Sequence, residues 1–364
     1  MRAVSYPAYG ALPTLGEVPD PVCPDGGVVL AVGATGVCRS DWHAWQGHDP
    51  VTLPHIPGHE LAGTVAEVGS GVTRWRVRDR VTVPFVCGCG VCGYCLAGDA
   101  QVCPDQTQPG FTGPGSFADR VAIHAADVNL VALPPSVDDV TAASLGCRFA
   151  TAYRALTVHG RLAAGDWLAV HGCGGVGLSA VLIGVALGAR VLAVDVSPVV
   201  LTRAQELDAE AVVDGSGMDN EEVARTVRDI TGGGAHVSLD AVGSAATAVA
   251  SVRSLRRRGR HVQVGLLFGP AATPPIPMDL VVAQELEIHG SHGMAAHEYP
   301  AMLDLIVAGR LRPERLVGRV VDLAGAGLAL ADLGTPSTSA GTTVVDLSRP
   351  QPAAEGPRRE HPVG

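Results

Sequence analysis

The glycine-rich turn at Gly172–Gly177 constrains the fold of this chain more than any other stretch. It reads Gly-Cys-Gly-Gly-Val-Gly, which fits G-x-G-x-x-G, and it lies between an apolar strand-like run, 167–171, and a helical segment, 176–187. Glycines in this order permit a tight turn and the close approach of a pyrophosphate, whose charge is met by the amides of the helix N-terminus. The pattern predicts a dinucleotide site. The alternative interpretation is a tight entry into the helix with no ligand.

Strands and helices continue to alternate after this turn, which favours a doubly wound parallel sheet of six strands in an α/β fold. A proline-rich loop, 270–277, precedes the last strand. The expected strands are 167–171, 190–195, 211–213, 236–240, 261–264 and 286–290, and the expected helices are 176–187, 199–207, 220–230 and 245–255.

The N-terminal part has a different pattern. Short β-like runs at 27–32, 61–68 and 80–83 are separated by glycine and proline turns, which is typical of a small β-barrel or sandwich. After the parallel sheet the chain continues through a helix at about 298–308 to short elements ending at 345–347, which we assign to this first domain. A chain of 364 residues exceeds the size at which one core keeps growing, so two domains are expected.

Asp195 ends the second strand of the parallel sheet, 18 residues after Gly177. A carboxylate there can accept hydrogen bonds from the adenosine ribose and would repel a 2′-phosphate, so NAD is favoured over NADP. The alternative is that Asp195 only caps the helix that Ser197 and Pro198 open.

The overall charge limits the possible partners. A net charge of -10 without a long Lys/Arg run disfavours nucleic acid and anionic membranes, so small molecules are the expected partners. The N-terminus lacks an apolar signal core, and the most apolar region, 176–194, is interrupted by Gly, Ser and Arg, which favours a cytoplasmic protein. The proline-rich, polar stretch 349–364 has the composition of a disordered tail.

Four closely spaced cysteines, Cys89, Cys92, Cys95 and Cys103, predict a structural zinc site. Four thiolates can close a tetrahedron around zinc and leave no position for water. The alternative is a set of buried free cysteines in a turn-rich loop. A zinc ribbon for nucleic acid is disfavoured by the acidic balance.

A second concentration of reactive side chains runs from Gly36 to Glu60. Cys38 and His59 are donors of the kind that zinc prefers, and hydroxyl, carboxylate and imidazole groups lie beside them in sequence. Two ligands do not make a site, so the chain must supply a third donor from elsewhere.

These motifs, in this order, resemble those of the zinc-dependent alcohol dehydrogenases of the medium-chain dehydrogenase/reductase superfamily. The resemblance covers roughly residues 1 to 347 and rests on the Cys38 element, the Gly-His-Glu at 58–60, the four-cysteine lobe and the dinucleotide turn. It implies a GroES-like β-barrel catalytic domain, 1–148 and 290–348, interrupted by a Rossmann NAD-binding domain at 149–289.

The resemblance also implies roles for single residues. Cys38, His59 and Cys147 match the catalytic zinc ligands, with Glu60 nearby and Asp41 as the partner of the ligand histidine. The alternative for Cys147 is a buried structural thiol. Ser40 and His43 resemble the proton relay of the family, although a lone Ser or His is more often structural. The expected cofactor contacts are Arg39, Gly172, Gly174, Gly175, Val176, Gly177, Asp195 and Val264.

Four aromatic residues are candidates for the walls of the substrate pocket, namely Trp42, Trp45, Phe85 and Phe117, with ordinary core packing as the alternative. Cys23, Cys87 and Cys173 have no role that the sequence assigns, although Cys173 is compatible with a small residue in the turn.

The resulting prediction is a reversible, NAD-linked interconversion of a hydrophobic primary or secondary alcohol with its aldehyde or ketone. It implies two zinc ions per subunit, one catalytic and one structural. The segment between Cys103 and Cys147 is short beside that of the dimeric members of the family and resembles that of the tetrameric bacterial ones, a resemblance that implies a homotetramer rather than a homodimer. The alternatives are a zinc-free quinone or enone reductase of the same superfamily and a non-catalytic NAD-binding scaffold.

Overall fold

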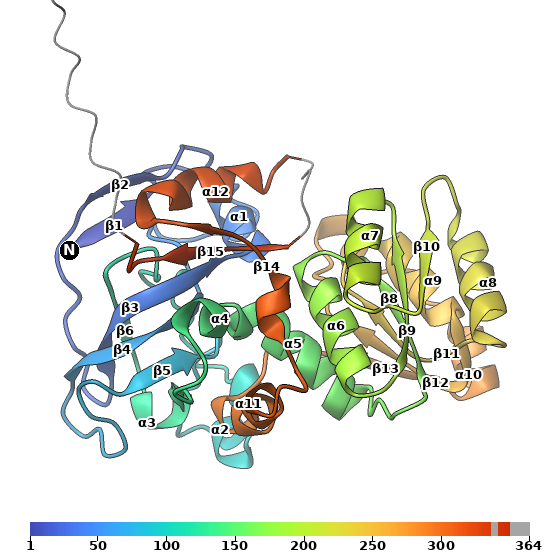
Figure 1. The fold of residues 1–364 in the computed structure, drawn as a ribbon, viewed down its shortest axis with the longest axis horizontal. Coiled ribbons are helices and arrows are strands. Elements are labelled where there is room, and N and C mark those ends of the chain that lie inside the picture. The colour runs from blue at the N-terminus through green and yellow to red at the C-terminus, as the bar shows by residue number, and fades with distance from the viewer. Residues whose placement is uncertain (336–340, 350–364) are drawn as a thin grey trace, which may run out of the picture.

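The structure, a computed structural model, describes residues 1–335 and 341–349. It has two sheet-bearing parts side by side (Figure 1). The N-terminal and C-terminal regions, coloured blue and red, together form the first part, and the middle of the chain forms the second. The second part is therefore an insertion in the first. The predicted disordered tail, 349–364, lies outside the described residues except for Arg349.

The first part contains a seven-stranded sheet in the order β14-β15-β3-β4-β5-β7, with β6 paired to β3, and a separate hairpin of β1 and β2. The three predicted β-runs of the N-terminal region are confirmed, and the first of them continues to Val37. The strands of the first part are β1 (Arg2–Ser5), β2 (Thr14–Glu17), β3 (Val28–Val37), β4 (Glu60–Val68), β5 (Arg80–Val83), β6 (Arg120–Ile123), β7 (Val131–Ala132), β14 (Val317–Val321) and β15 (Thr342–Asp346).

The second part contains the predicted six-stranded parallel sheet, in the order β10-β9-β8-β11-β12-β13. Neighbouring strands are parallel throughout. All five residues of β8 are buried, as expected for a strand covered by helices on both faces. The strand order reverses between β8 and β11, and ligands of such sheets bind at the carboxyl ends beside this point. The strands are β8 (Trp167–His171), β9 (Arg190–Asp195), β10 (Ala211–Asp214), β11 (Ala235–Asp240), β12 (Leu255–Gln263) and β13 (Glu287–Gly290).

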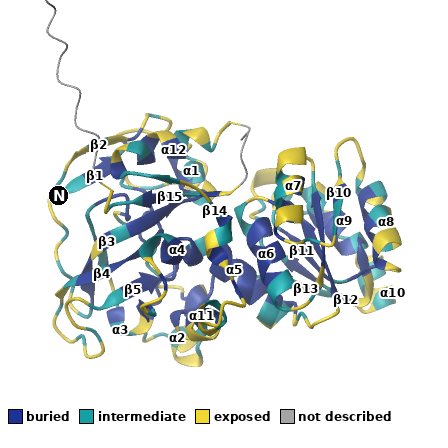
Figure 2. Ribbon diagram, in the orientation of Figure 1, coloured by how far each residue is buried: buried dark blue, intermediate teal, exposed yellow. Residues whose placement is uncertain are grey.

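The helices differ in how far they are buried (Figure 2). The α6 helix is apolar on nearly every side and lies between the two parts, whereas α8 has one buried face and one exposed face. Within the described residues, no helix is long and apolar enough to cross a membrane. The helices are α1 (Arg39–Trp45), α2 (Gly93–Ala97), α3 (Ala126–Asn129), α4 (Asp139–Ala143), α5 (Ala150–Arg154), α6 (Gly175–Ala186), α7 (Pro198–Glu206), α8 (Asn220–Thr231), α9 (Ala245–Arg253), α10 (Met278–Gln284), α11 (Tyr299–Val307) and α12 (Ala326–Asp332).

The β12 strand departs most from its predicted bounds. It begins at Leu255, inside the predicted helix 245–255, and the predicted strand 261–264 corresponds to its second half. Three arginines and Gly259 occupy its first half and hide the apolar pattern, and the register with β11 shifts there. Leu255 and Arg260 pair with β11, and the residues between them form a bulge that lengthens the strand.

The two parts share one hydrophobic core. Phe149, Leu178 of α6 and Tyr299 of α11 belong to the same buried cluster. The helical run from Leu145 to His159 passes through it without a break, as a π-helical turn, α5 and a second π-helical turn. A packed junction of this kind fixes the position of the second part against the first. The domain boundary at 148/149, which falls inside this run, stays a prediction.

Candidate active site

The pairing of β3 with β4 brings the first two predicted zinc ligands together. Gly36 is paired with Glu60 in this antiparallel register. Cys38 lies two residues beyond Gly36, at the N-cap of α1, and His59 lies one residue before Glu60. The sheet register therefore places a thiol and an imidazole next to each other.

Cys147 completes the donor set from the other side. It lies in the π-helical turn Leu145–Phe149, and one ligand atom from each of Cys38, His59, Glu60 and Cys147 lies within 4.8 Å of the others. Cys147 alone of the four is partly exposed. The structure thus brings the three predicted ligands and Glu60 to one point at the junction of the two parts.

The imidazole of His59 is held in a single orientation. Its Nδ1 lies 2.9 Å from Asp41 Oδ1, and the Asp41 carboxylate also accepts the backbone N–H groups of Cys38 and Gly58, at 3.1 and 3.0 Å. Within the described part of the chain, the buried Nε2 of His59 has no hydrogen-bond partner. Buried polar atoms are normally paired, so an unpaired nitrogen in a cluster with two thiols fits a zinc ion.

The thiols and the imidazole influence each other's protonation. A hydrogen bond from Cys147 lowers the pKa of Cys38 well below its usual value, and the same bond raises the pKa of Cys147. Burial acts against a charged His59, but the Asp41 carboxylate overcomes it and raises the pKa of that imidazole. The site therefore already favours a thiolate, which is the form that binds metal.

Glu60 is completely buried and pairs with Arg148, a residue to which the sequence analysis gave no role. Glu60 Oε1 accepts the backbone N–H groups of Cys147 and Arg148, at 3.2 and 3.1 Å, and Arg148 Nε at 3.0 Å. Arg148 Nη2 donates to Oε2. The one signal in the sequence was a charged side chain directly after the third ligand in an otherwise apolar run.

The two predicted relay residues lie on α1. The thiol of Cys38 lies 3.9 Å from Ser40 Oγ, so Ser40 lies beside the donor set. The Nδ1 of His43 lies 3.1 Å from that of His48, and its ring contacts Phe268 of the second part, with ring centres 5.6 Å apart. The relay itself stays a prediction, and His48 is a neighbour that the sequence did not indicate.

Two aromatic rings face the ligand histidine. The ring centres of Phe111 and Phe85 lie 5.1 and 6.1 Å from that of His59. The expectation that Phe117 lines the pocket is wrong, because it is completely buried in a core cluster with Val4.

The two tryptophans that the sequence proposed for the pocket have other contacts. The indole of Trp45 is buried in the same core cluster as Phe117 and donates to the carbonyl of Ala11 at 2.6 Å. Trp45 is therefore also a core residue. Trp42 is only partly buried and lies under the guanidinium of Arg39, which is 5.0 Å from the ring centre.

The dinucleotide turn has the geometry that its glycines predict. Gly172 has φ 86, and a Cβ at Gly177 would overlap the carbonyl oxygen of Gly172, so α6 packs directly on the end of β8. Gly174 is exposed, and nothing lies within 4 Å of a Cβ built there. Gly175 and Val176 form the first turn of α6. This leaves the helix N-terminus open to an anionic group.

The contacts of Asp195 are compatible with both interpretations of its role, namely capping the start of α7 and binding the adenosine ribose. Its Oδ2 accepts the backbone N–H of Cys173 at 2.7 Å, which ties the turn to β9. Its Oδ1 accepts those of Val196 and Ser197, at 2.8 and 2.9 Å. Oδ2 accepts only one of these bonds and has a further lone pair, and the side chain is partly exposed, so it can also accept a ribose hydroxyl.

The other two expected cofactor contacts come from different parts of the molecule. Arg39 is exposed at the start of α1. Val264 directly follows β12 and donates its backbone N–H to the carbonyl of Asp240 at 3.0 Å. Val264 therefore lies at the carboxyl edge of the parallel sheet, on the same edge as the turn.

The four cysteines of the predicted structural site form a second cluster, with their sulfur atoms within 4.8 Å of one another. Backbone N–H groups of Cys92 and Cys95 donate to the sulfur atoms of Cys89 and Cys92, at 3.4 and 3.5 Å. Such bonds stabilise thiolates, and a cluster of four fits a closed zinc site.

We expect Cys95→Ala to reduce the bound zinc from two ions to one per chain and to lower the Tm. The α2 helix in this lobe has no buried residues, so little besides the metal would hold it. The loss should reach at least about 2 °C, the shift that 1 kcal/mol produces in a domain of this size. Metal analysis and thermal unfolding measure both effects, with Cys23→Ala as the control. Two retained ions and an unchanged Tm would contradict the assignment.

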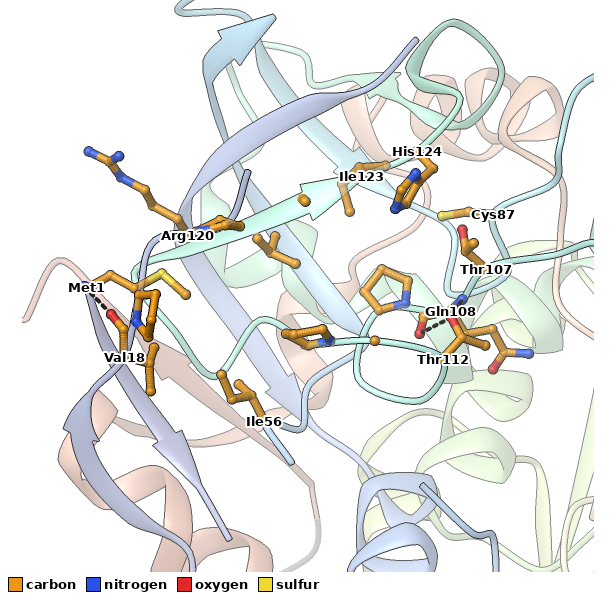
Figure 3. Close-up of a pocket in the computed structure, with 17 residues that line it drawn as sticks. Met1, Val18, Ile56, Cys87, Thr107, Gln108, Thr112, Arg120, Ile123 and His124 are labelled. Carbon is orange, nitrogen blue, oxygen red and sulfur yellow. Dashed lines mark hydrogen bonds between the residues drawn. The ribbon is translucent and has the colours of Figure 1, made fainter. Parts of the chain in front are cut away.

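The three unassigned cysteines lie apart from both clusters. Cys87 is buried, and burial raises its pKa to about 12. It lines a cavity of about 300 Å³ in the first part, and Figure 3 shows it next to Thr107 on the wall of this cavity. Among the described residues, no predicted zinc ligand or cofactor contact lines that cavity. Cys173 is buried in the turn, and Cys23 is partly buried near Gly27.

Two family models match separate parts of the chain. The model of the alcohol dehydrogenase GroES-like domain matches residues 24–135, and that of the zinc-binding dehydrogenase matches residues 175–308. Both matches overlap the features described above. The first holds Cys38, His59 and the four-cysteine lobe, and the second begins at α6.

Individual proteins are similar over most of their length. An alcohol dehydrogenase of Geobacillus stearothermophilus is 34% identical over 300 residues, which are 82% of this chain and 86% of that protein. The solved structure of an alcohol dehydrogenase from Thermus sp. ATN1 has a TM-score of 0.87 at 31% identity and covers 95% of this chain and 99% of its own. That of an NAD-dependent alcohol dehydrogenase has a TM-score of 0.84 at 28% identity, with 95% and 100% covered.

Proposed function

Because this chain belongs to the zinc-dependent alcohol dehydrogenases of the medium-chain dehydrogenase/reductase superfamily, we propose that its reaction occurs where Cys38, His59 and Cys147 meet. The protein is an oxidoreductase that interconverts an alcohol with its aldehyde or ketone, using NAD and zinc. What remains to be assigned is which residues hold each group and which alcohol they accept.

The observation that carries the assignment is the buried Nε2 of His59, which has no hydrogen-bond partner among the described residues although His59 shares a cluster with the thiols of Cys38 and Cys147. We assign the catalytic zinc to Cys38, His59 and Cys147, and the structural zinc to the four-cysteine lobe. When bound, the catalytic zinc supplies a Lewis acid that favours ionisation of the alcohol, and the nicotinamide accepts the hydride. Asp41 keeps the His59 ring in the tautomer that leaves Nε2 free.

The residues around the donor set suit an apolar alcohol. Phe85 and Phe111 lie edge-on to His59 and would exclude water from the reacting carbon. The dinucleotide is assigned to the open turn at Gly174–Val176, with the Asp195 carboxylate toward the ribose, which favours NAD over NADP. Ser40, beside the donor set, would take the proton from the alcohol, and His43 on the same helix would be the base that finally holds it.

The proton path leads to a pH prediction for His43. Burial, with the neighbouring His48 and Arg39 charges, lowers its pKa below the usual value of about 6.5. The neutral imidazole is the base, so it is present above its pKa and is lost as the pH falls through it. Alcohol oxidation that depends on His43 should therefore persist at pH 6.5 and decline only below it.

Replacing His43 by Gln should remove this base at every pH. We expect kcat/KM for alcohol oxidation to fall by about 10²-fold, the lower end of the contribution of general base catalysis. The acid limb that the wild type shows below pH 6.5 should disappear. A pH profile of initial rates measures both effects. An identical profile in wild type and H43Q would exclude His43 from the path.

The experiment that tests the function is a set of initial rates for apolar and polar, primary and secondary alcohols and the matching carbonyl compounds, run with NAD(H) and NADP(H) beside zinc quantification. We expect two zinc ions per chain, turnover of apolar alcohols and a preference for NAD. Activity without zinc would favour a quinone or enone reductase. Two zinc ions and no turnover across the panel would favour an NAD-binding scaffold.

Two further predictions concern the cellular compartment of the enzyme and its oligomeric state. All nine cysteines lie in the described residues and none of them is bridged, which supports a reducing compartment such as the cytoplasm. Small molecules are the substrates of this family. Assembly as a homotetramer or homodimer is a proposal that a measurement of mass in solution would test.

A further inference from the structure

Glu60 could occupy a position at the catalytic zinc that the substrate needs. One of its carboxylate oxygens lies within 4.8 Å of the donor atoms of Cys38, His59 and Cys147. A catalytic zinc has three protein ligands and keeps its fourth position for water or substrate, whereas a zinc with four protein ligands is a structural site. The carboxylate must therefore be off the metal when the substrate binds.

The structure shows that both oxygens of Glu60 are directed to Arg148 and its backbone. The guanidinium binds them in the two-pronged manner, with Nε on Oε1 and Nη2 on Oε2, while the N–H groups of residues 147 and 148 add two bonds to Oε1. Glu60 is 0% exposed and Arg148 is 7% exposed, so water does not weaken the pair. Paired arginine–carboxylate forks of this kind are strong and directional.

Glycines on three different elements make room for this ion pair. A Cβ at Gly36 of β3 would overlap Glu60 Oε2, and a Cβ at Gly175 would overlap the Cδ of Arg148. A Cβ at Gly146 would lie 3.0 Å from the Cα of Glu60. Gly175 is part of the dinucleotide turn, so the stem of Arg148 lies between the metal donors and the start of α6.

We propose that Arg148 is a positioning residue that holds the Glu60 carboxylate away from the catalytic zinc and so keeps one coordination position open for the substrate oxygen. This inference rests on the proposed function in that it takes Cys38, His59 and Cys147 as the zinc ligands. Arg148 is the one arginine or lysine that forms an ion pair with Glu60 among residues 1–335 and 341–349. Without its guanidinium, we expect the buried carboxylate to turn to the divalent cation.

The test uses Co²⁺ in place of the catalytic zinc, because its visible spectrum reports the number and kind of ligands. The probe is imidazole, which shifts the spectrum only if it finds an open position. In wild type we expect a saturable shift. In Arg148→Met we expect no shift at the same concentrations, together with a fall in kcat of at least 100-fold. In the double variant E60Q/R148M we expect the imidazole shift to return and kcat to recover to within about tenfold of wild type.

Arg154→Met is the matched control. Arg154 lies in the same helical run, is 8% exposed and pairs with Glu298 at 3.2 Å, so its loss reports what removing any buried arginine does here. It should keep the imidazole shift.

Either of two results would overturn the proposal. One is an imidazole shift in R148M equal to that of wild type, and the other is a folded double variant as inactive as R148M. If R148M does not fold, the imidazole shift of E60Q/R148M is compared with that of the single variant E60Q. A double variant that lacks the shift would then also refute the inference. The spectral measurement needs no turnover, so a wild type that shows the shift but oxidises no alcohol would refute the function and leave the role of Arg148 standing.

Discussion

Cys38→Ser is expected to lower kcat/KM for alcohol oxidation by at least about 10³-fold, since Lewis-acid stabilisation is worth several kcal/mol and about 1.4 kcal/mol corresponds to a factor of ten. Serine replaces a thiolate ligand by a hydroxyl that stays protonated near neutral pH. It is also a favoured N-cap residue, so α1, which begins at Arg39, should keep its start. The loss should therefore reflect the metal and not the fold.

The measurements are initial rates, zinc content and a thermal melt. One zinc ion, held by the four-cysteine lobe, should remain in Cys38→Ser. Cys87→Ser is the matched control, because Cys87 is equally buried and lies outside both donor sets. It should lose some stability and keep two ions and its activity. Undiminished turnover in Cys38→Ser would refute the assignment of this thiol to the catalytic zinc.

Asp41→Asn is expected to weaken binding of the catalytic zinc by about 10- to 100-fold, the usual effect of removing the partner of a ligand histidine. The Asp41 carboxylate serves three donors, namely His59 Nδ1 and the backbone N–H groups of Cys38 and Gly58. The amide of Asn has only one acceptor oxygen. Its NH₂ group replaces the other oxygen and is a donor, so it cannot accept from the buried N–H groups. At least one of these donors is then unpaired, and the orientation of the His59 ring is no longer fixed.

Competition with a chelator measures the zinc affinity directly. Asp119→Asn is the control. It also removes a carboxylate that has a side-chain partner, here the guanidinium of Arg2, but Asp119 lies away from the metal donors. The chelator should remove the catalytic ion from D41N at a lower concentration than from wild type and leave the structural ion in place. Equal zinc retention in D41N and D119N would show that Asp41 does not support the site.

The parts of the fold that the sequence predicted best are those in which local pattern and final packing agree. The β8 and β9 strands are short apolar runs between turn residues, and they are buried on both faces in the parallel sheet. The first half of β12 failed as a prediction because its three arginines carry no apolar strand pattern and lie in a bulge, between the residues Leu255 and Arg260 that pair with β11. The short C-terminal helix α12 was likewise not recognised among the elements after the parallel sheet.

In the site, too, the residues that form a local sequence pattern were predicted, and those that only packing brings together were not. Spacing in the sequence indicated the four-cysteine lobe, and the Cys38 and Gly-His-Glu motifs indicated the donor set. Phe117 and Phe111 could not be told apart, because only the folded β-domain decides which ring enters the core and which one faces His59. The partnership of Glu60 with Arg148 joins residues 88 positions apart, and no local pattern connects them.

The register of β3 against β4 has a consequence for how such a protein can diversify. Because Gly36 is paired with Glu60, the sheet and not the connecting segment sets the position of Cys38 relative to His59. The stretch at 46–54 between them contains no helix or strand. Insertions or deletions there would remodel the approach to the metal while the ligands stay in place. We therefore expect variation in the length of this segment to leave the distance between Cys38 and His59 unchanged.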